Sequence, residues 1–266
     1  MNFDDIIIKY PRTPHIEGSR LQPGDEDLSQ RQFDEIAGKY LVLEEKIDGA
    51  NSAISFSPDG ELRIQSRGHF LTGGARERHY DLLKQWAAVH RDKFYEVLGR
   101  RYVMYGEWMY AKHSIYYDLL PNYFIEFDIY DRENGLFLST SERRKLIAHL
   151  PVSSCAVLAE GIFHNRSDVL QYLTNSKYIS ERHLENLRET AQRLGVDADA
   201  ISKQTDATRT MEGIYIKVES DGSVTDRMKF VRPTFLQTVV TTDQKWLNRV
   251  IIPNKLAITL SELFIP

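Results

Sequence analysis

The feature that most constrains this chain is a lysine two residues before an Asp-Gly pair, at the end of an apolar run. The run Tyr40–Leu43 predicts a buried strand, and Lys46, Asp48 and Gly49 follow it. A strand end is a rigid place from which to present a nucleophile. The spacing therefore makes Lys46 a candidate for covalent chemistry.

A simpler interpretation is that this Asp-Gly pair only forms a hairpin turn leading to a second strand at residues 52–56. The chain has two other such pairs, Asp59-Gly60 and Asp221-Gly222. Neither has a lysine two residues upstream, so we expect both to be turns and nothing more.

Composition limits the classes of protein that this chain can be. Its 266 residues contain one cysteine, Cys155, which excludes an internal disulfide framework and any zinc site of several cysteines. The net charge of −4 argues against a protein that coats nucleic acid nonspecifically. The stretch 63–101 nevertheless leans basic and offers a place for a phosphate backbone.

The termini and the apolar runs bear on location. The first residues lack the basic region and long apolar core of a signal peptide. No apolar run approaches the roughly 20 residues that cross a bilayer. We therefore expect a cytoplasmic protein that does not enter a membrane.

Hydrophobic patterning predicts strands interleaved with helices. The expected strands are 6–10, three between 40 and 65, 102–108, 123–130, 156–163, 211–219 and 223–231. The expected helices are 29–36, 76–98, one opened by the Ser139–Glu142 capping box and stopped by Pro151, 167–174 and 181–194. Residues 197–210 are expected to be a surface loop.

These elements predict an α+β fold with antiparallel sheets and flanking helices. We find no repeat, low-complexity linker or clean boundary, so we expect a single domain over residues 1–266. It would comprise a lead-in at 1–39, a core at 40–232, and a helical tail at 233–266 that packs on the core.

Several predicted strands carry acids or bases where a purely structural strand would be apolar or neutral. Glu107 lies in an aromatic run, and Asp128 lies in the alternating stretch 124–130. Glu212 begins a strand that Lys217 ends, and the last strand is basic. Taken singly, each is best interpreted as the solvent-facing side of an amphipathic strand.

The order of these signatures carries more weight than any one of them. The chain reads lysine-x-Asp-Gly, Ser-Arg, Tyr-Gly-Glu, Phe-Asp-Ile, Glu-Gly-x-x-x-Lys and then a basic strand, from about residue 40 to 232. It resembles the covalent nucleotidyltransferases, which comprise DNA ligases, RNA ligases and RNA capping enzymes. The short leader and the gaps between motifs look most similar to the RNA ligase 2-like branch. The resemblance implies a nucleotidyltransferase domain.

The resemblance also implies roles for individual residues. Lys46 would attack the α-phosphate of ATP to give a lysyl–AMP phosphoramidate. Glu45 would help to recognise adenine, and Asn51 and Arg67 match positions near the sugar and phosphates. Glu107 matches a ribose-contacting motif that also supports the later steps.

The later motifs imply further contacts. Phe127 would stack on adenine, and Asp128 belongs to the same motif. Glu212 would act with a metal ion, for which Asp48 is a second candidate ligand. The cations Lys217, Lys229 and Arg227 would contact phosphates.

Elementary acid–base chemistry agrees with a metal requirement. A free lysine with a pKa near 10.4 is only about 0.1% neutral at pH 7.4, so ~4 kcal/mol separates it from a ready nucleophile. Cations, metal and partial desolvation lower such a pKa, whereas carboxylates raise it. Oxygen ligands favour Mg²⁺ or Mn²⁺.

Two departures from the family pattern stand out. The last motif reads Arg227-Met228-Lys229, where many relatives have two lysines, and Arg232 is another candidate partner for Lys229. An arginine in place of a lysine is not a neutral exchange. About 34 residues follow Arg232, too few for a C-terminal OB-fold, so we expect none. A partner protein is one source of the missing substrate-binding domain.

The function that this pattern favours is an ATP-dependent RNA ligase in RNA repair, joining 5′-phosphate and 3′-hydroxyl RNA ends, including those of a nicked duplex. Two alternatives remain. One is a DNA ligase or guanylyltransferase-like enzyme. The other is a catalytically inactive nucleotide-binding subunit of a repair complex.

Overall fold

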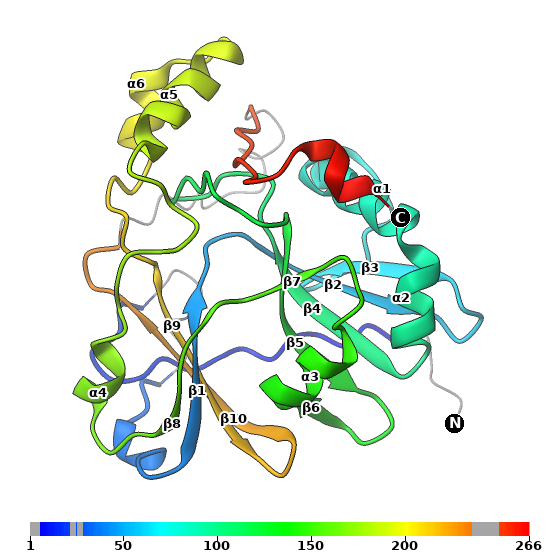
Figure 1. Ribbon diagram of the computed structural model, residues 1–266, viewed down its shortest axis with the longest axis vertical. Helices are drawn as coiled ribbons and strands as arrows, with labels where there is room; N and C mark the ends of the chain where they lie inside the picture. The colour runs from blue at the N-terminus through cyan, green and yellow to red at the C-terminus, as the bar shows by residue number, and fades with distance from the viewer. Residues whose placement is uncertain (1–5, 22–24, 26–28, 236–249, 266) are drawn as a thin grey trace.

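The computed structural model describes residues 6–21, 25, 29–235 and 250–265 (Figure 1). These residues form an α+β fold built on one ten-stranded, mostly antiparallel sheet, as predicted. The strand order is β3-β2-β4-β5-β6-β10-β9-β1-β8, and β7 pairs with β5. The strands are β1 (Tyr40–Lys46), β2 (Ala50–Phe56), β3 (Leu62–Ser66), β4 (Tyr102–Trp108), β5 (Phe124–Asp131), β6 (Leu136–Leu138), β7 (Ser153–Ser154), β8 (Val157–Ile162), β9 (Gly213–Ser220) and β10 (Ser223–Val231).

The Asp48-Gly49 pair joins two halves of this sheet. Strand β1 pairs with β8 and β9, whereas β2 pairs with β3 and β4, so β1 and β2 do not form a hairpin. The simpler interpretation of this pair as a hairpin turn is therefore wrong. The crossing is tight, because a Cβ on Gly49 would lie 2.6 Å from the Met109 sulfur and 2.9 Å from the Trp108 carbonyl oxygen.

The other two Asp-Gly pairs are turns, as expected. Asp59-Gly60 lies between β2 and β3, and Asp221-Gly222 lies between β9 and β10. Glycines 60 and 222 both have φ in the left-handed region, which glycine adopts without strain.

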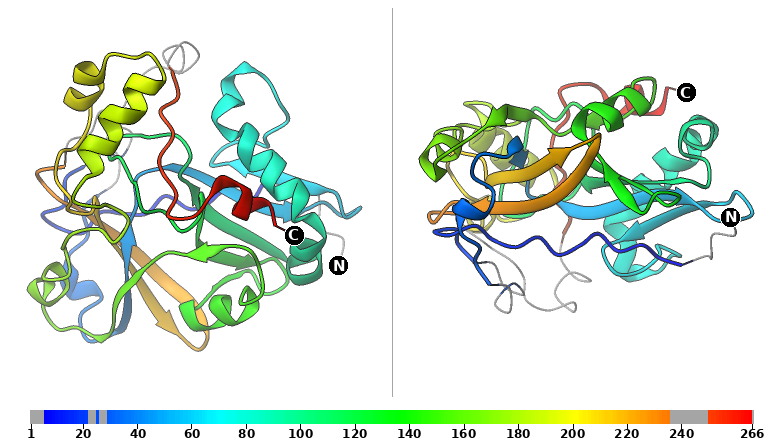
Figure 2. Two further views of the ribbon diagram at one scale, coloured as in Figure 1. Left: turned by 45° about the horizontal axis from the view of Figure 1, so that its top comes forward. Right: turned by 90° about the horizontal axis from the view of Figure 1, so that it is seen from below.

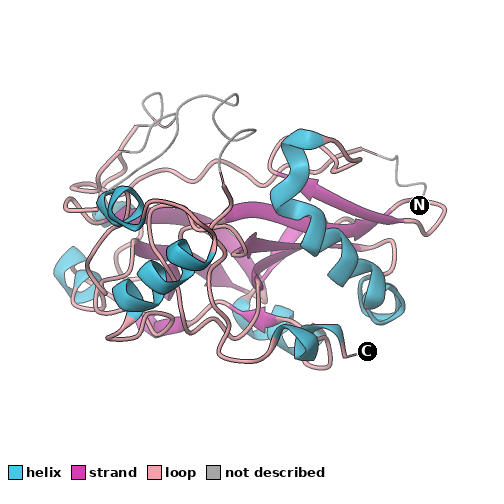
Figure 3. Ribbon diagram, turned by 90° about the horizontal axis from the view of Figure 1, so that it is seen from above, coloured by secondary structure: helices cyan, strands magenta, loops and turns pink. Residues whose placement is uncertain are grey.

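Two apolar cores lie under the two halves. Residues of β2, β4 and β5 pack against the helices α1 (Asp81–Val89) and α2 (Arg91–Leu98), with Trp86 and Phe94 fully buried. Alternate residues of β9 pack with Phe33 and Ile36 of the lead-in. Figures 2 and 3 show the helices gathered around the sheet rather than within it. The opposite side chains of β9 are thereby left to face the middle of the molecule.

The helix predicted over 76–98 is broken into three pieces. A 3₁₀ helix, η2 (Ala75–Tyr80), precedes α1, and His90 separates α1 from α2. The His90 Nε2 atom donates a hydrogen bond of 2.7 Å to the Leu263 carbonyl oxygen, which holds the break against the C-terminal segment. Gly99 ends α2 with φ of 48°, in the left-handed region that glycine adopts without strain.

The remaining helices are mostly shorter than predicted. They are α3 (Thr140–Leu146), α4 (Arg166–Leu170), α5 (His183–Arg193) and α6 (Ala198–Lys203), with the 3₁₀ turn η1 (Phe33–Glu35) where 29–36 was expected. Ser139 caps α3, because its Oγ accepts a hydrogen bond of 3.3 Å from the Glu142 amide. The 197–210 segment is not only a loop, because the Asp197 side chain caps α6 by accepting hydrogen bonds from two amides. Residues 6–10 form no strand.

The tail differs from a continuous helix in the part that the structure describes. Residues 236–249, which include Trp246, lie outside the described residues. Of 250–265, only η3 (Leu260–Phe264) is helical, and Leu263 lies in the core with α1 and α2. None of the described helices combines the length and apolar character of a membrane span.

Candidate active site

The Lys46 side chain lies at the end of β1, against a carboxylate from the neighbouring strand. Its Nζ atom donates a hydrogen bond of 2.6 Å to Glu212 Oε1, and the side chain is 18% exposed. Register pairs Lys46 with Gly213, the residue after Glu212. A Cβ at position 213 would overlap the Phe230 carbonyl oxygen at 1.8 Å, so only glycine lets β9 close on β10 here.

The charge of Lys46 is held in place by its neighbours. Burial lowers its pKa, but the carboxylates of Glu212, Glu107 and Asp48 outweigh burial and raise the pKa above its ordinary value. The lysine is therefore an ammonium in this state. Attack on a phosphate requires these carboxylates to be engaged elsewhere, or the proton to be removed.

Asp48 is held by the loop that follows β4. Its Oδ2 atom accepts hydrogen bonds from the amides of Ser114 (2.6 Å) and Ile115 (3.1 Å). Its own amide donates to the Tyr117 hydroxyl at 2.9 Å. His113 Nδ1 lies 3.8 Å from Asp48 Oδ1. The loop fixes the carboxylate two residues from Lys46.

Glu107 and Asn51 face each other across β4 and β2. Burial raises the pKa of Glu107 to about 7, and the charges of Lys46 and Arg67 oppose that rise. Arg67 is exposed at the turn after β3. Glu107 therefore approaches Lys46 from the other half of the sheet.

Lys229 is anchored by the lead-in. Its Nζ atom donates a hydrogen bond to Asp25 Oδ2, and His15 Nε2 lies 3.1 Å from the same oxygen. Burial lowers the pKa of Lys229, Asp25 opposes this, and the nearby charges of Lys46 and Arg67 lower it further. Sequence reasoning did not find Asp25 or His15, because Asp25 lies 204 positions from Lys229.

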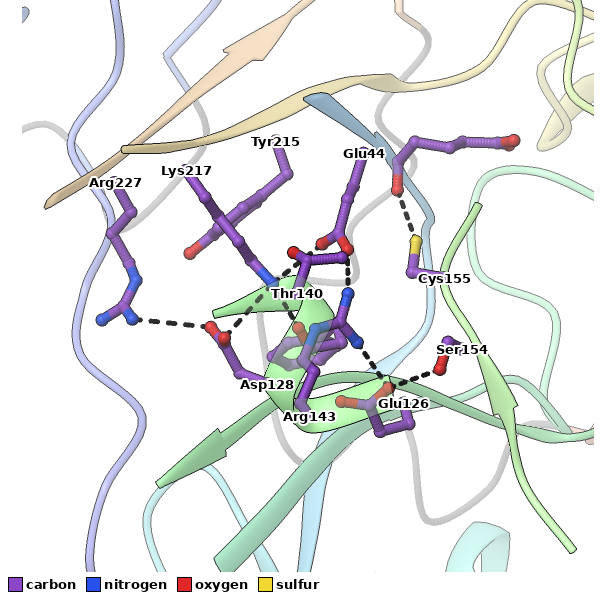
Figure 4. A network of polar contacts seen from close by, with 12 residues as sticks. Glu44, Glu126, Asp128, Thr140, Arg143, Ser154, Cys155, Tyr215, Lys217 and Arg227 are labelled. Atoms are coloured by element: carbon purple, nitrogen blue, oxygen red, sulfur yellow. Dashed lines mark hydrogen bonds and ion pairs between the residues drawn. The ribbon is translucent and has the colours of Figure 1, made fainter. Parts of the chain in front are cut away.

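A second polar cluster is almost entirely buried (Figure 4). Lys217 Nζ lies 2.9 Å from Glu44 Oε2 and 3.2 Å from Asp128 Oδ1, with its side chain fully buried. Arg143 bonds Glu44 and also Glu126, the latter at 2.5 Å. Three carboxylates thus meet three cations, counting the contact of Arg227 with Asp128.

The structure therefore separates some of the predicted phosphate contacts from Lys46. Lys217 lies in the internal cluster and has no exposed surface for a phosphate. Arg227 is 3.5 Å from Asp128 and lies over the Phe137 ring at 4.1 Å. The half-buried Phe127 ring packs edge-on against Tyr10 at 5.1 Å. These side chains join the two halves of the sheet.

Arg232 lies apart from both Lys46 and the buried cluster around Lys217. Its Nη2 atom donates a hydrogen bond of 2.5 Å to Asp206 Oδ2, and its Nε atom donates to the Met211 carbonyl oxygen at 2.9 Å. The structure does not bring it to Lys229. It fixes the segment after α6 to the end of β10.

Glu45 presents an unusual buried carboxylate. It is 1% exposed, and neither oxygen makes a hydrogen bond of standard geometry with the described residues. Burial raises its pKa to about 7, although the Ser176 hydroxyl and the Lys177 amide lie close enough to oppose this. The buried Cys155 donates from its sulfur to the Glu45 carbonyl oxygen at 3.0 Å. The two oxygens suit an exocyclic amino group as donor.

Replacing Glu45 by glutamine should stabilise the protein above pH 7. A carboxyl with a pKa raised from 4.5 to about 7 favours folding at low pH, and that contribution is lost as pH rises through both values. The neutral amide avoids the loss, so we expect a gain of up to about 3 kcal/mol at pH 8.5 and little change at pH 4.5. Urea unfolding at the two pH values measures this. An equal effect at both would contradict it.

No group of three or more His, Cys, Asp or Glu side chains arranged to hold a metal ion occurs among the described residues. Glu212 and Asp48, the predicted ligands, both lie beside Lys46, and each already has a partner. The chain thus offers two separate carboxylates and no closed cage in the part that the structure describes.

Comparison with known proteins adds independent evidence. Among solved structures, the chain is similar to Naegleria gruberi RNA ligase with PPi, at 20% identity and a TM-score of 0.51, over 88% of this chain and 58% of that one. A variant of the same ligase with ATP and Mn gives 17% identity and a TM-score of 0.51 over the same shares. A variant with AMP and Mn gives 15% and 0.53. The shared feature is the fold.

The chain spans 58% of the length of these ligases. No match was found among curated proteins. The family model for RNA ligase matches residues 39–231, which is more than half of the chain and contains Lys46, Glu107, Glu212 and Lys229. The chain therefore belongs to the RNA ligase family.

Proposed function

We propose that this protein is an ATP-dependent RNA ligase that acts through a lysyl–AMP intermediate on Lys46. The observation that carries the proposal is the contact of Lys46 with Glu212 at the junction of the two halves of the sheet. Glu107 and Asp48 approach the same amine, and Lys229 and Arg67 bring positive charge to it. A lysine among carboxylates and cations at a strand end is suited to phosphoryl chemistry.

In the first step, the neutral Lys46 amine attacks the α-phosphorus of ATP. A P–N bond forms, the bond to the bridging oxygen breaks, and pyrophosphate leaves. In the second step, a 5′-phosphate oxygen of RNA attacks the same phosphorus and the lysine amine leaves. In the third, a 3′-hydroxyl attacks the RNA 5′-phosphorus, AMP leaves, and the hydroxyl proton passes to a base.

The buried Glu45 carboxylate supports adenine as the base. The adenine 6-amino group would donate a hydrogen bond to an oxygen that otherwise lacks one, whereas guanine presents a carbonyl oxygen at that position. An unmet buried acceptor costs about 1–3 kcal/mol, so the preference for ATP over GTP should be large. The related Naegleria ligase variants with ATP or AMP agree with this choice.

A divalent cation fits this site as a partner of the nucleotide. Magnesium commonly uses one or two carboxylates together with substrate phosphates, and Glu212 and Asp48 would hold it. Bound there, the cation would neutralise phosphate charge and offset the effect of the carboxylates on Lys46. The structure of the related Naegleria ligase variant with ATP and Mn supports Mn²⁺ as such a cation.

The test is covalent labelling of the protein with α-labelled ATP or GTP. Protein with Mg²⁺ or Mn²⁺ should retain label from ATP on a denaturing gel. Adding 5′-phosphorylated RNA should move the label to RNA, and a 3′-hydroxyl end should then release AMP as the ends are sealed. Label from GTP alone would favour a guanylyltransferase, and transfer to DNA ends only would favour a DNA ligase. No label, in protein without bound AMP, would favour a nucleotide-binding subunit.

A further inference from the structure

A cavity of about 750 Å³ opens beside the Lys46 site, between the start of β2, the end of β3 and the 3₁₀ helix η2. We call it the η2 cavity. Its volume lies within the range of roughly 300–1,000 Å³ typical of small-molecule sites. Its lining residues are Ala50, Ser66, His69, Gly73, Gly74, Ala75, Arg76, Glu77, His79, Tyr80 and His113.

The η2 cavity adjoins the reacting lysine. His113, at one wall, lies 3.8 Å from the Asp48 carboxylate. Tyr80, at another, donates its hydroxyl to the Asn51 carbonyl oxygen at 3.5 Å. None of Glu45, Glu212 and Lys229 lines the cavity. It is therefore a second binding place next to Lys46, apart from the residues assigned to the adenine and the metal.

The lining favours an anion. Arg76 is exposed at the cavity, as is His69, whose Nε2 atom lies 4.0 Å from Glu77 Oε1. Glu77 is the one acid among the lining residues, and it is already paired. Its carboxylate accepts hydrogen bonds from Lys84 Nζ at 2.6 Å and from the Gly73 amide at 2.7 Å. The surplus charge of the cavity is therefore positive.

The inner part of the cavity suits an uncharged ring. The His79 and Tyr80 rings lie 4.1 Å apart, and Ala50 and Ala75 add small apolar surfaces. Burial, together with the nearby His113, lowers the pKa of His79 to about 4, so this imidazole is neutral at physiological pH. An arginine at the rim and a neutral aromatic interior match a phosphate joined to a nucleoside.

We propose that the η2 cavity binds the 5′-phosphorylated terminal nucleotide of the RNA that receives AMP from Lys46. This inference rests on the proposed ligase function. Arg76 and His69 hold the terminal phosphate, and His79 and Tyr80 receive its sugar or base. The 5′-phosphate is favoured over the 3′-hydroxyl end as occupant, because a terminal phosphate carries a charge near −2 and a hydroxyl carries none.

The test isolates the second step. Full-length protein carrying labelled AMP on Lys46, freed of ATP, is mixed with 5′-phosphorylated single-stranded RNA in a single turnover. Arg76→Ala and His69→Ala should each slow transfer of AMP to subsaturating RNA by about tenfold or more, the effect of losing a hydrogen bond to a charged group. Formation of lysyl–AMP from ATP should stay within about twofold of wild type.

Arg78→Ala is the matched control. Arg78 is an exposed arginine of the same 3₁₀ helix that does not line the cavity, so its removal changes net charge equally. It should transfer AMP at the wild-type rate. RNA with a 5′-hydroxyl lacks the phosphate that Arg76 would hold. As a competitor, it should therefore inhibit AMP transfer to subsaturating 5′-phosphorylated RNA to the same extent in wild type and in Arg76→Ala.

Three results would overturn the inference. Wild-type transfer rates in both cavity variants would do so, as would an equal loss in Arg78→Ala. The third is slower joining of pre-adenylylated RNA to a 3′-hydroxyl strand with normal AMP transfer, which would assign the cavity to the 3′ end. Failure of the wild-type protein to form lysyl–AMP is a different result and would overturn the ligase function itself.

Discussion

Replacing Lys46 by alanine should abolish lysyl–AMP formation, lowering the rate of covalent labelling by ATP at least ~10³-fold. The Lys46 amine supplies the nitrogen that forms the P–N bond. Lys39→Ala is the matched control, because Lys39 is an exposed lysine one residue before β1. Retention of labelling by Lys46→Ala would contradict the assignment of Lys46.

The same variant should separate the steps of the reaction. Sealing of RNA that is already adenylylated breaks no bond to lysine, so Lys46→Ala should keep a measurable part of that activity. In wild type, labelling should accelerate as pH rises, approaching tenfold per unit while Lys46 governs the rate. The labelling rate rises with pH because only the neutral amine attacks, and the surrounding carboxylates raise the pKa of Lys46. A labelling rate that falls between pH 6.5 and 8.5 would argue that deprotonation of the Lys46 nucleophile does not limit the rate.

The motif order placed three charged residues, Lys46, Glu107 and Glu212, in one expected site. Lys46, Glu107 and Glu212 come from three strands, and the structure brings them together. The motif order carried this information, since none of the individual residues could be distinguished from a solvent-facing strand position. The α+β class followed from local patterning in the same way.

The position of Lys217 could not be predicted from its motif. Register pairs Lys217 with Val42, whereas Lys46 pairs with Gly213, so Lys217 lies four strand positions away from the Lys46 end of the strands. At roughly 3.3 Å per residue this is about 13 Å. Lys229 pairs with Tyr215, two positions nearer to that end than Lys217. A motif supplies the residue type, but the register of the sheet decides which lysine reaches the site.

The polar partners of these lysines could not be predicted, for a related reason. Asp25 reaches Lys229 from the lead-in, and Arg143 reaches Glu44 from α3, across 99 positions of sequence. The hairpin interpretation of Asp48-Gly49 was wrong because a turn signal does not say which strands pair. All of these contacts depend on pairing between segments far apart in the chain.

Arg143→Met should lower the free energy of unfolding by about 3–5 kcal/mol, the usual effect of removing one partner of a buried ion pair. Arg143 is fully buried and holds Glu44 of β1 and Glu126 of β5, so its loss leaves two buried carboxylates without their shared cation. Lys145→Met, in the same helix, breaks only an exposed pair with Glu142 and should change stability by less than about 0.5 kcal/mol. Urea unfolding compares the two.

Removing the two carboxyl charges distinguishes unpaired charge from lost packing. Without Arg143, Glu44 and Glu126 are buried carboxylates that have lost their shared cation. Glu44→Gln together with Glu126→Gln should therefore restore part of the stability that Arg143→Met loses. A deficit that the two amides leave unchanged would attribute the effect to packing. Arg143 joins β5 to β1 at Glu44, two residues before Lys46. Folded Arg143→Met protein should therefore also form lysyl–AMP more slowly, whereas Lys145→Met should not.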